Sequence, residues 1–277
     1  MLCLIRYTAD GGLAGHVYSR AHEYPLEKLR RAILLVAVIG AALIGVAGIF
    51  LNNGAREDNT IEGNSLDNQL TGTPYTDTMS GFEGNDQLEG LAGKDIIYAG
   101  YGNDRIDGGP GDDLLYGGHD RDLALLGGPG LDRVDGGPGD DRLYGGDGSD
   151  GLYGSDGRDY LNLGDGGGTG DGGRDEDEVV GGYGRDRLEG GGDDDQVTGG
   201  PSTDRLEGSS GNDVLRGEEG NDSIFGEVGI DTMIGGRGDD FIYAVDRVPN
   251  ETVDCGPGAY DLAYVDPGEV TVNCETP

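Results

Sequence analysis

Aspartate residues recur every nine positions along most of this chain, and each is preceded by a cluster of glycines. The unit is clearest from Gly108 onward, where the sequence reads G-G-P-G-D-D-L-L-Y and later G-G-P-G-D-D-R-L-Y. Aspartate supplies a hard anionic oxygen of the kind that Ca²⁺ prefers. Glycine accepts positive φ angles and lets backbone carbonyls come close to an ion. The pattern predicts a row of turns that bind hard cations through carboxylate and carbonyl oxygens.

The residues after each aspartate indicate the element that positions it. An apolar residue follows two places later, as at Leu115 after Asp113. Because side chains alternate faces along a strand, this residue points inward from a short strand of roughly three residues. Two such units form one coil, so aspartates 18 positions apart stack at about 4.8 Å. The expected fold is all-β, a parallel β-roll.

The aspartate column can be followed from residue 59 to residue 240. Its first two members are Asn59 and Asn68, a change typical of a terminal repeat. The predicted Ca²⁺ ligands are Asp77, Asp86, Asp95, Asp104, Asp113, Asp122, Asp132, Asp141, Asp150, Asp159, Asp177, Asp186, Asp195, Asp204, Asp213, Asp222, Asp231 and Asp240. The inward apolar partners include Ile61, Leu70, Met79, Leu88, Ile97, Ile106, Leu115 and Ala124, and in the second half Val179, Leu188, Val197, Leu206, Leu215, Ile224, Met233 and Ile242.

Two places interrupt this pattern. One extra residue is present around Leu126. Gly168 then stands where an aspartate is expected after Asp159, and Gly170 stands where the apolar residue is expected. Since that unit lacks both its ligand and its core residue, we expect residues 162–172 to form a loop that bulges from the roll.

The composition indicates that folding depends on cations. With 59 glycines and a formal net charge of −35, the chain would ordinarily be disordered. Burying one apolar side chain contributes about 1.5 to 3 kcal/mol, whereas ordering the backbone costs about 1 to 2 kcal/mol for each residue of the unit. We therefore expect roughly a dozen or more Ca²⁺ ions to neutralise the stacked aspartates and to drive folding. The sequence has no basic patch, so nucleic acid is not expected as a partner.

Three segments precede the repeats. Residues 1–31 are irregular and end in a basic cluster, residues 32–51 are twenty uncharged and mostly apolar positions, and residues 52–58 are a polar linker. The apolar segment fits a transmembrane anchor with its N-terminus inside, or the core of a signal peptide cleaved after Ala47; we favour the anchor. Both interpretations place the repeats, residues 59–242, outside the cytoplasm.

The glycine pattern ends after Ile242, and we expect residues 243–277 to form a small β cap over the open end of the roll. Alternating segments such as E-T-V-D-C and E-V-T-V-N-C predict strands. A bridge between Cys255 and Cys274 would close a loop of about 20 residues and contribute about 3 kcal/mol. Two free buried cysteines are the alternative, and Cys3 has no obvious partner.

The units G-G-P-G-D-D-L-L-Y and G-G-Y-G-R-D-R-L-E resemble haemolysin-type calcium-binding repeats of the RTX family, and the resemblance extends from Asn59 to Ile242. It implies a parallel β-roll with several Ca²⁺ ions bound in the turns by the aspartate column, often in secreted bacterial proteins. The best-known members carry a toxin, protease or lipase domain and a C-terminal export signal, whereas an apolar segment precedes the repeats here. The cysteine-containing tail is similar to that of short actinobacterial proteins.

We interpret the chain as an exported, non-catalytic calcium-binding protein at the cell surface or in the extracellular space, with a structural or surface-interaction role. The alternative is a remnant or module of a secreted enzyme, toxin or adhesin. The sequence contains neither H-E-x-x-H nor G-x-S-x-G, and its histidines do not have zinc-ligand spacing, so we expect no catalytic residues and no cofactor besides Ca²⁺. A membrane is a partner only through residues 32–51, and the sequence identifies no protein or glycan partner.

Overall fold

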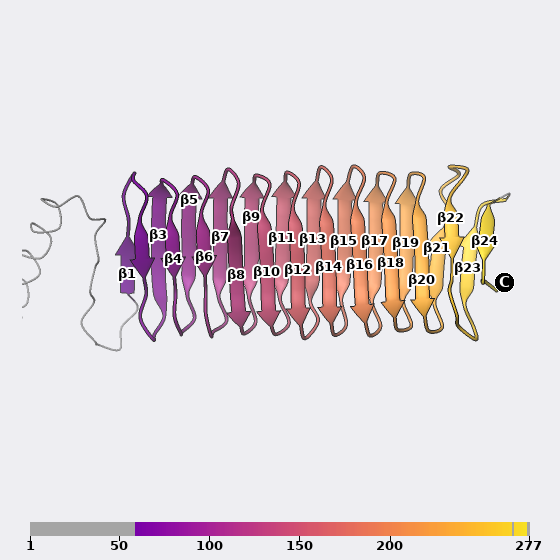
Figure 1. Cartoon of the computed structure of the whole chain (residues 1–277), viewed down its shortest axis with the longest axis horizontal. Coiled ribbons are helices and arrows are strands. Elements are labelled where there is room, and N and C mark those ends of the chain that lie inside the picture. The colour runs from indigo at the N-terminus through magenta and orange to yellow at the C-terminus, as the bar shows by residue number, and fades with distance from the viewer. Residues whose placement is uncertain (1–58, 268, 276–277) are drawn as a thin grey trace, which may run out of the picture. The chain divides into compact units, whose positions relative to one another are not determined.

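The computed structural model describes residues 59–267 and 269–275, and these residues form a parallel β-solenoid. Each coil adds one strand to each of two sheets, so that the strands follow one another along the roll from β1 to β24 (Figure 1). Odd-numbered strands make one 12-stranded sheet and even-numbered strands make the other. No α-helix occurs in the part of the chain that the structure describes. The predicted all-β parallel roll is therefore confirmed.

The strands of the two sheets have the following bounds. The first sheet contains β1 (Asn59–Glu62), β3 (Asp77–Glu83), β5 (Ile96–Tyr101), β7 (Leu114–His119), β9 (Arg133–Pro138), β11 (Gly151–Asp156), β13 (Thr169–Arg174), β15 (Arg187–Gly192), β17 (Arg205–Ser210), β19 (Ser223–Val228), β21 (Phe241–Ala244) and β23 (Leu262–Val265). The second contains β2 (Gln69–Thr71), β4 (Gln87–Glu89), β6 (Arg105–Asp107), β8 (Ala124–Pro129), β10 (Arg142–Asp147), β12 (Tyr160–Asp165), β14 (Glu178–Tyr183), β16 (Gln196–Pro201), β18 (Val214–Glu219), β20 (Thr232–Arg237), β22 (Thr252–Asp254) and β24 (Val270–Val272).

Neighbouring strands of one sheet are paired in parallel with the register that the 18-residue spacing predicts. Leu143 of β10 is opposite Leu161 of β12, and Gly146 is opposite Gly164. Because the glycines join the ladder, β10 and most strands of the repeats are six residues long rather than the three expected. The glycine pair thus belongs to the strand as well as to the turn that follows.

A single column of apolar side chains fills the space between the two sheets. Its members are almost completely buried, from Ile61 at 4 % exposed to Ile242 at 0 %. The prediction is wrong at one position, because Leu125 is the inward residue that pairs with Ile106 on one side and Leu143 on the other. The extra residue therefore lies just before Leu125, and Ala124 is buried beside it without holding the central place.

The predicted loop at 162–172 is also wrong. Strand β13 spans Thr169–Arg174 and pairs with β11 and β15 like any other strand. Leu163 is 2 % exposed, and a Cβ added to Gly170 would lie 3.0 Å from the Cδ1 atom of Leu163. The side chains of Val179, Leu163 and Leu188 therefore fill the space that the glycine at position 170 leaves in the core, and Leu163 stands where the repeats usually have glycine.

The tail extends both sheets. Val253 of β22 is opposite Met233, and Ala263 of β23 is opposite Ile242, both in parallel register. A disulfide joins Cys255 and Cys274, as predicted. The expected cap is thus the last part of the solenoid itself, with longer connections between its strands.

Several sequence predictions concern residues outside the described part of the chain. The segment 32–51, the flanking residues 1–31 and 52–58, and Cys3 all belong to this group. Among residues 59–267 and 269–275, no helix is long and apolar enough to cross a membrane.

Candidate metal-binding turns

The predicted ligands all lie at the entrance to a strand, where the turn ends. Each of the eighteen aspartates named above is 4 % exposed or less. Those that precede odd-numbered strands stack in one row, and those that precede even-numbered strands stack in a second row, because each coil has one turn on each side. The structure therefore brings all of them together as two buried columns of carboxylates.

In every predicted ligand except Asp77 and Asp186, Oδ1 of the carboxylate accepts a backbone amide of the neighbouring coil. The backbone amide of Asp95 donates a hydrogen bond of 2.8 Å to Oδ1 of Asp113, and the amide of Asp141 donates one of 2.7 Å to Oδ1 of Asp159. The same bond spans the extra residue, where the Asp113 amide reaches Oδ1 of Asp132 at 2.8 Å. This bond fixes the direction of the carboxylate and leaves Oδ2 for another partner.

That second oxygen is buried and unpaired along almost the whole column. Oδ2 has no hydrogen-bond partner in any predicted ligand from Asp86 to Asp240, whereas Oδ2 of Asp77 accepts the amide of Thr73. A buried carboxylate oxygen without a partner is strongly unfavourable. A regular row of such atoms indicates that a cation completes the turns.

The glycines leave room for oxygen atoms around Oδ2. A Cβ added to Gly108 would lie 2.6 Å from Oδ2 of Asp113 and 2.8 Å from the carbonyl oxygen of Gly127 in the next coil. At Gly111 an added Cβ would lie 1.5 Å from the carbonyl oxygen of Gly93, so no side chain fits there. Carboxylate and carbonyl oxygens thus face the same small spaces.

This donor set fits Ca²⁺, which takes six to eight oxygen ligands that include backbone carbonyls. Within residues 59–267 and 269–275, no three side chains of the His, Cys, Asp and Glu types are arranged to hold a metal ion by themselves. Backbone carbonyls would therefore supply a large share of the ligands, and this is consistent with turns built from glycine.

Burial makes the ionised carboxylates costly. Burial, together with the nearby carboxylates of Asp150 and Asp113, raises the pKa of Asp132 to about 7, against the lowering effect of the hydrogen bond from the Asp113 amide. For the same main reason, burial, the highest values in the column, about 8, are the pKa values of Asp122, Asp159 and Asp195. Without a cation these groups are held partly in the protonated form near neutral pH.

One row is interrupted at Gly168, as the sequence predicts. Gly168 precedes β13 in the place of an aspartate, and its carbonyl accepts the amide of Arg187 at 2.9 Å, as the carbonyl of Asp113 accepts the amide of Arg133. A groove of about 420 Å³ beside Gly168 is lined by arginines and aspartates of the next two coils on this side, among them Arg185, Asp186 and Asp204. The Gly168 turn has no carboxylate at the column position, so we expect it to contribute no side-chain ligand.

The columns extend beyond the last predicted ligand. Asp261, which is 2 % exposed, accepts the amide of Asp240 at its Oδ1 at 2.9 Å, and Glu251, which is 3 % exposed, precedes β22 as Asp231 precedes β20. Sequence reasoning missed both, because the spacings are 21 and 20 residues and no glycine pair comes before Glu251. The signal that could have found them is an acidic residue two places before an inward apolar residue.

Comparison with protein-family models gives one match, to the RTX calcium-binding nonapeptide repeat. The model, which represents four copies of the repeat, matches residues 62–97, 89–124, 126–161, 171–206, 198–233 and 226–244. No curated protein matches the chain.

Proposed function

The chain belongs to the family of RTX calcium-binding nonapeptide-repeat proteins, and we propose that it is an exported protein whose repeats fold when they bind Ca²⁺. The observation that carries this proposal is the row of buried, unpaired Oδ2 atoms along both carboxylate columns. A folded roll with these atoms ionised and unpaired would be destabilised in every coil. Ca²⁺ binds the folded turns and not the extended chain, so that binding contributes directly to folding.

The predicted ligands from Asp77 to Asp240 would hold the ions together with carbonyl oxygens of the glycine turns. Each ion would supply positive charge and would replace the missing partner of Oδ2. The aspartates of one coil and the carbonyls of the next face the same space, as at Asp113 and Gly127. An ion in that space would therefore also join consecutive coils, and the calcium response would be cooperative along the roll.

We further propose a non-catalytic role, structural or in surface interaction. The acidic side chains of the columns are engaged with backbone amides at Oδ1 and face glycine turns at Oδ2, an arrangement that suits ion binding better than proton transfer to a substrate. The remaining role is then that of an elongated calcium-stabilised body. A screen for hydrolysis of polysaccharides and esters would test this part, and turnover that is lost with a single column aspartate would contradict it.

Circular dichroism during Ca²⁺ titration tests the central claim. We expect the full chain in chelator to lack most of its β-structure and to gain it cooperatively in millimolar Ca²⁺. Mg²⁺ is the control, and it should substitute poorly because its small octahedral shell does not suit turns rich in carbonyls. An equal β-signal in chelator, Mg²⁺ and Ca²⁺ would reject calcium-driven folding.

Export is supported by two features of different kind. The uncharged segment 32–51 follows a basic cluster, and a disulfide such as Cys255–Cys274 persists mainly in oxidising compartments. Protease added to intact cells should therefore cleave the repeats. Repeats that are protected until the cells are lysed would contradict export.

A further inference from the structure

Glu251 occupies a column position in the tail, beyond the residues that match the repeat family. The match ends at residue 244, and no nine-residue turn leads into β22. Even so, Thr252 is opposite Thr232 in the sheet, which places Glu251 next to Asp231 in the same carboxylate row. The position is therefore continuous with the repeat turns, although its sequence is different.

The Glu251 carboxylate is enclosed and has no partner. The residue is 3 % exposed, and both Oε1 and Oε2 are buried without a hydrogen bond. A column aspartate such as Asp231 differs, because its Oδ1 accepts the amide of Asp213 at 2.9 Å and only Oδ2 is unpaired. Glu251 thus has a whole buried carboxylate group that no protein donor satisfies.

The loop around Glu251 is shaped by other carboxylates that are already engaged. Asp246 accepts the amides of Gly229 at 3.2 Å and Val248 at 2.6 Å, Asp266 accepts the amide of Arg247, and Glu269 accepts the amide of Asn250 at 3.0 Å. In the preceding coil, the amide that corresponds to Gly229 bonds a backbone carbonyl instead, from Gly211 to Val228. Acidic side chains have thus replaced carbonyls in closing this turn.

All of the charged groups that shift the pKa of Glu251 are carboxylates. Besides burial, the carboxylates of Asp246, Asp231, Glu269 and Asp266 all raise its pKa. Carboxylates gathered around an enclosed and unpaired carboxylate either share a proton or bind a cation. A glutamate that offers both oxygens is a common bidentate ligand of Ca²⁺.

We propose that the turn of residues 245–251 binds one divalent cation of the Ca²⁺ class through the Glu251 carboxylate. Loop carbonyls and water complete its shell, because no three acidic side chains converge there within the described residues. This ion would neutralise the turn and would order the loop that leads to Cys255 of the disulfide. The site goes beyond the calcium-driven folding of the repeats, since it lies outside them and can be removed separately.

Hydrogen exchange at peptide resolution, during Ca²⁺ titration of the full chain, can test this site. We compare the wild type, Glu251→Gln and the control Glu227→Gln, which removes the same charge from an exposed glutamate. In Glu251→Gln, protection of peptides covering 245–255 should need about tenfold more Ca²⁺ or lose its Ca²⁺ dependence, since ligand charge sets affinity. Protection of residues 132–159 should keep its midpoint, and Glu227→Gln should match the wild type throughout.

Glutamine imitates a protonated glutamate, so the competing possibility gives a different result. If Glu251 only shares a proton, Glu251→Gln will leave the Ca²⁺ midpoint of peptides 245–255 unchanged, and the proposal is rejected.

A second variant, Glu251→Asp, keeps the negative charge and shortens the side chain, so that it separates the effect of charge from the effect of packing. It should retain most of the Ca²⁺ response if the carboxylate is a ligand, and equal impairment of both variants would overturn the proposal. A chain in which residues 132–159 also ignore Ca²⁺ would instead reject the function proposed for the repeats.

Discussion

The repeat coils and the tail extend the same two sheets but are held together by different contacts. In the coils, Oδ1 of one aspartate accepts the amide of the aspartate one coil before it, and Oδ2 is left unpaired in almost every turn. In the tail, a disulfide joins Cys255 and Cys274, whereas the repeats contain no cysteine. On the proposed function the coils should therefore depend on bound Ca²⁺, whereas the disulfide of the tail needs no ion.

This difference follows from the length of the connections. Most strands of the nine-residue repeats bury only one large apolar side chain, so that on the proposed function bound ions supply much of the stability. From Asp240 to Asp261 the spacing grows to 21 residues, and this longer segment contains Cys255, one partner of the disulfide. The same two sheets thus continue from the repeats into a tail that carries a covalent contact.

The largest expected effect is on the coils when calcium is removed and the pH is changed. Burial raises the pKa of column aspartates to between about 6 for Asp95 and about 8 for Asp159, above the value of about 3.9 in an unfolded chain. Groups with a raised pKa stabilise the fold below the unfolded value, and this contribution is lost as the pH rises through the folded values. In chelator, the roll should therefore hold more β-structure at pH 5.5 than at pH 8.

Circular dichroism in chelator at the two pH values measures this effect, and the same scan in millimolar Ca²⁺ is the control. With Ca²⁺ the trend should reverse, because the ion binds the ionised form of the carboxylate. A β-signal in chelator that is unaffected by pH would show that the columns do not limit the stability of the coils.

The second prediction removes three ligands from adjacent turns. Replacing Asp132, Asp141 and Asp150 by Ala should raise the Ca²⁺ midpoint of folding and weaken the coils next to them, because each residue loses both its Oδ1 bond and its ion ligand. Hydrogen exchange of peptides from β8 to β12 is the measurement.

Its matched control replaces three exposed aspartates of the same coils, Asp140, Asp147 and Asp156. These substitutions remove the same charge and should leave the midpoint close to that of the wild type. Equal shifts in both triple variants would mean that total charge, rather than the buried columns, determines the calcium response.

The periodic features of this fold could be predicted because each nine-residue unit contains the glycines of its turn, its aspartate ligand and its apolar core residue. The two sheets, their parallel register and the burial of residues such as Asp113 and Leu115 follow from that period. The positions of Leu125 and Leu163 did not follow. Leu125 replaces Ala124 because the strand shifts by one residue to bury the larger side chain, and Leu163 compensates for Gly170 from the adjacent strand of the other sheet. Packing across the core decides such cases.

The last positions of the carboxylate columns, which lie in the tail, were harder to predict for a related reason. Glu251 and Asp261 align with the columns in space, but the insertions before them break the period on which sequence reasoning depends. The pairing of Cys255 with Cys274 was predictable, because few cysteines are present and both lie at the ends of strand-like segments. Positions fixed by the backbone register alone become visible only in the structure.

The third prediction concerns the tail. Replacing Cys255 and Cys274 by Ser should destabilise the tail by about 3 kcal/mol, because the bridge closes a loop of about 20 residues. Peptides from β22 to β24 should lose hydrogen-exchange protection, while those from β9 to β12 keep theirs at the same Ca²⁺ concentration. Loss of protection along the whole roll would show that the tail is required for the coils to fold.

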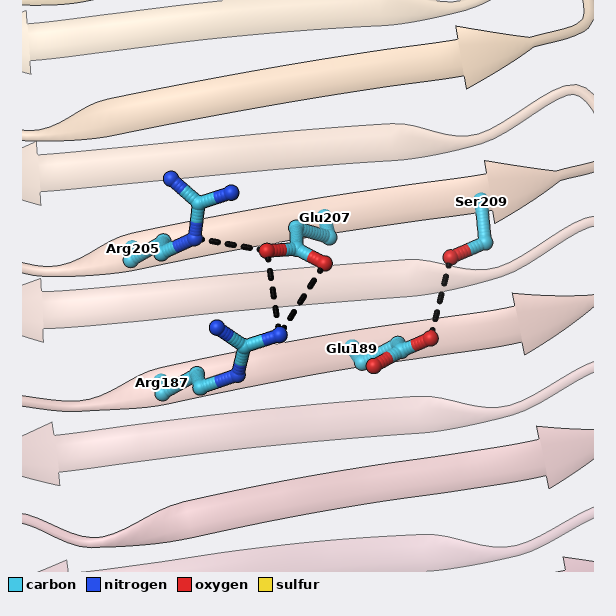
Figure 2. Close-up of polar contacts among 5 residues, drawn as sticks. All are labelled: Arg187, Glu189, Arg205, Glu207 and Ser209. Atoms are coloured by element: carbon cyan, nitrogen blue, oxygen red, sulfur yellow. Dashed lines mark hydrogen bonds and ion pairs between the residues drawn. The ribbon is translucent and has the colours of Figure 1, made fainter.

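The smallest expected effect lies on the outer face of the first sheet, where contacts are partly solvated. Glu207 lies between two arginines of neighbouring strands, with Arg205 Nε at 2.6 Å and Arg187 Nη2 at 3.2 Å, as Figure 2 shows. The Glu207 side chain is 11 % exposed, but those of Arg187 and Arg205 are 53 % and 41 % exposed. Solvent therefore screens much of the attraction, and Glu207→Gln should cost only about 1 kcal/mol.

Glu189 on the adjacent strand is the matched control, since it is opposite Glu207 and accepts a single hydrogen bond of 3.2 Å from the Ser209 hydroxyl (Figure 2). Glu189→Gln should change stability by no more than about 0.5 kcal/mol. Urea unfolding of both variants in saturating Ca²⁺ gives the difference, and high salt should reduce it because the arginines are exposed. If Glu207→Gln destabilises the roll as much as the loss of the disulfide does, ion pairs on the sheet surface contribute as much to the free energy of unfolding as the covalent contact of the tail. The contrast between the two regions would then not hold.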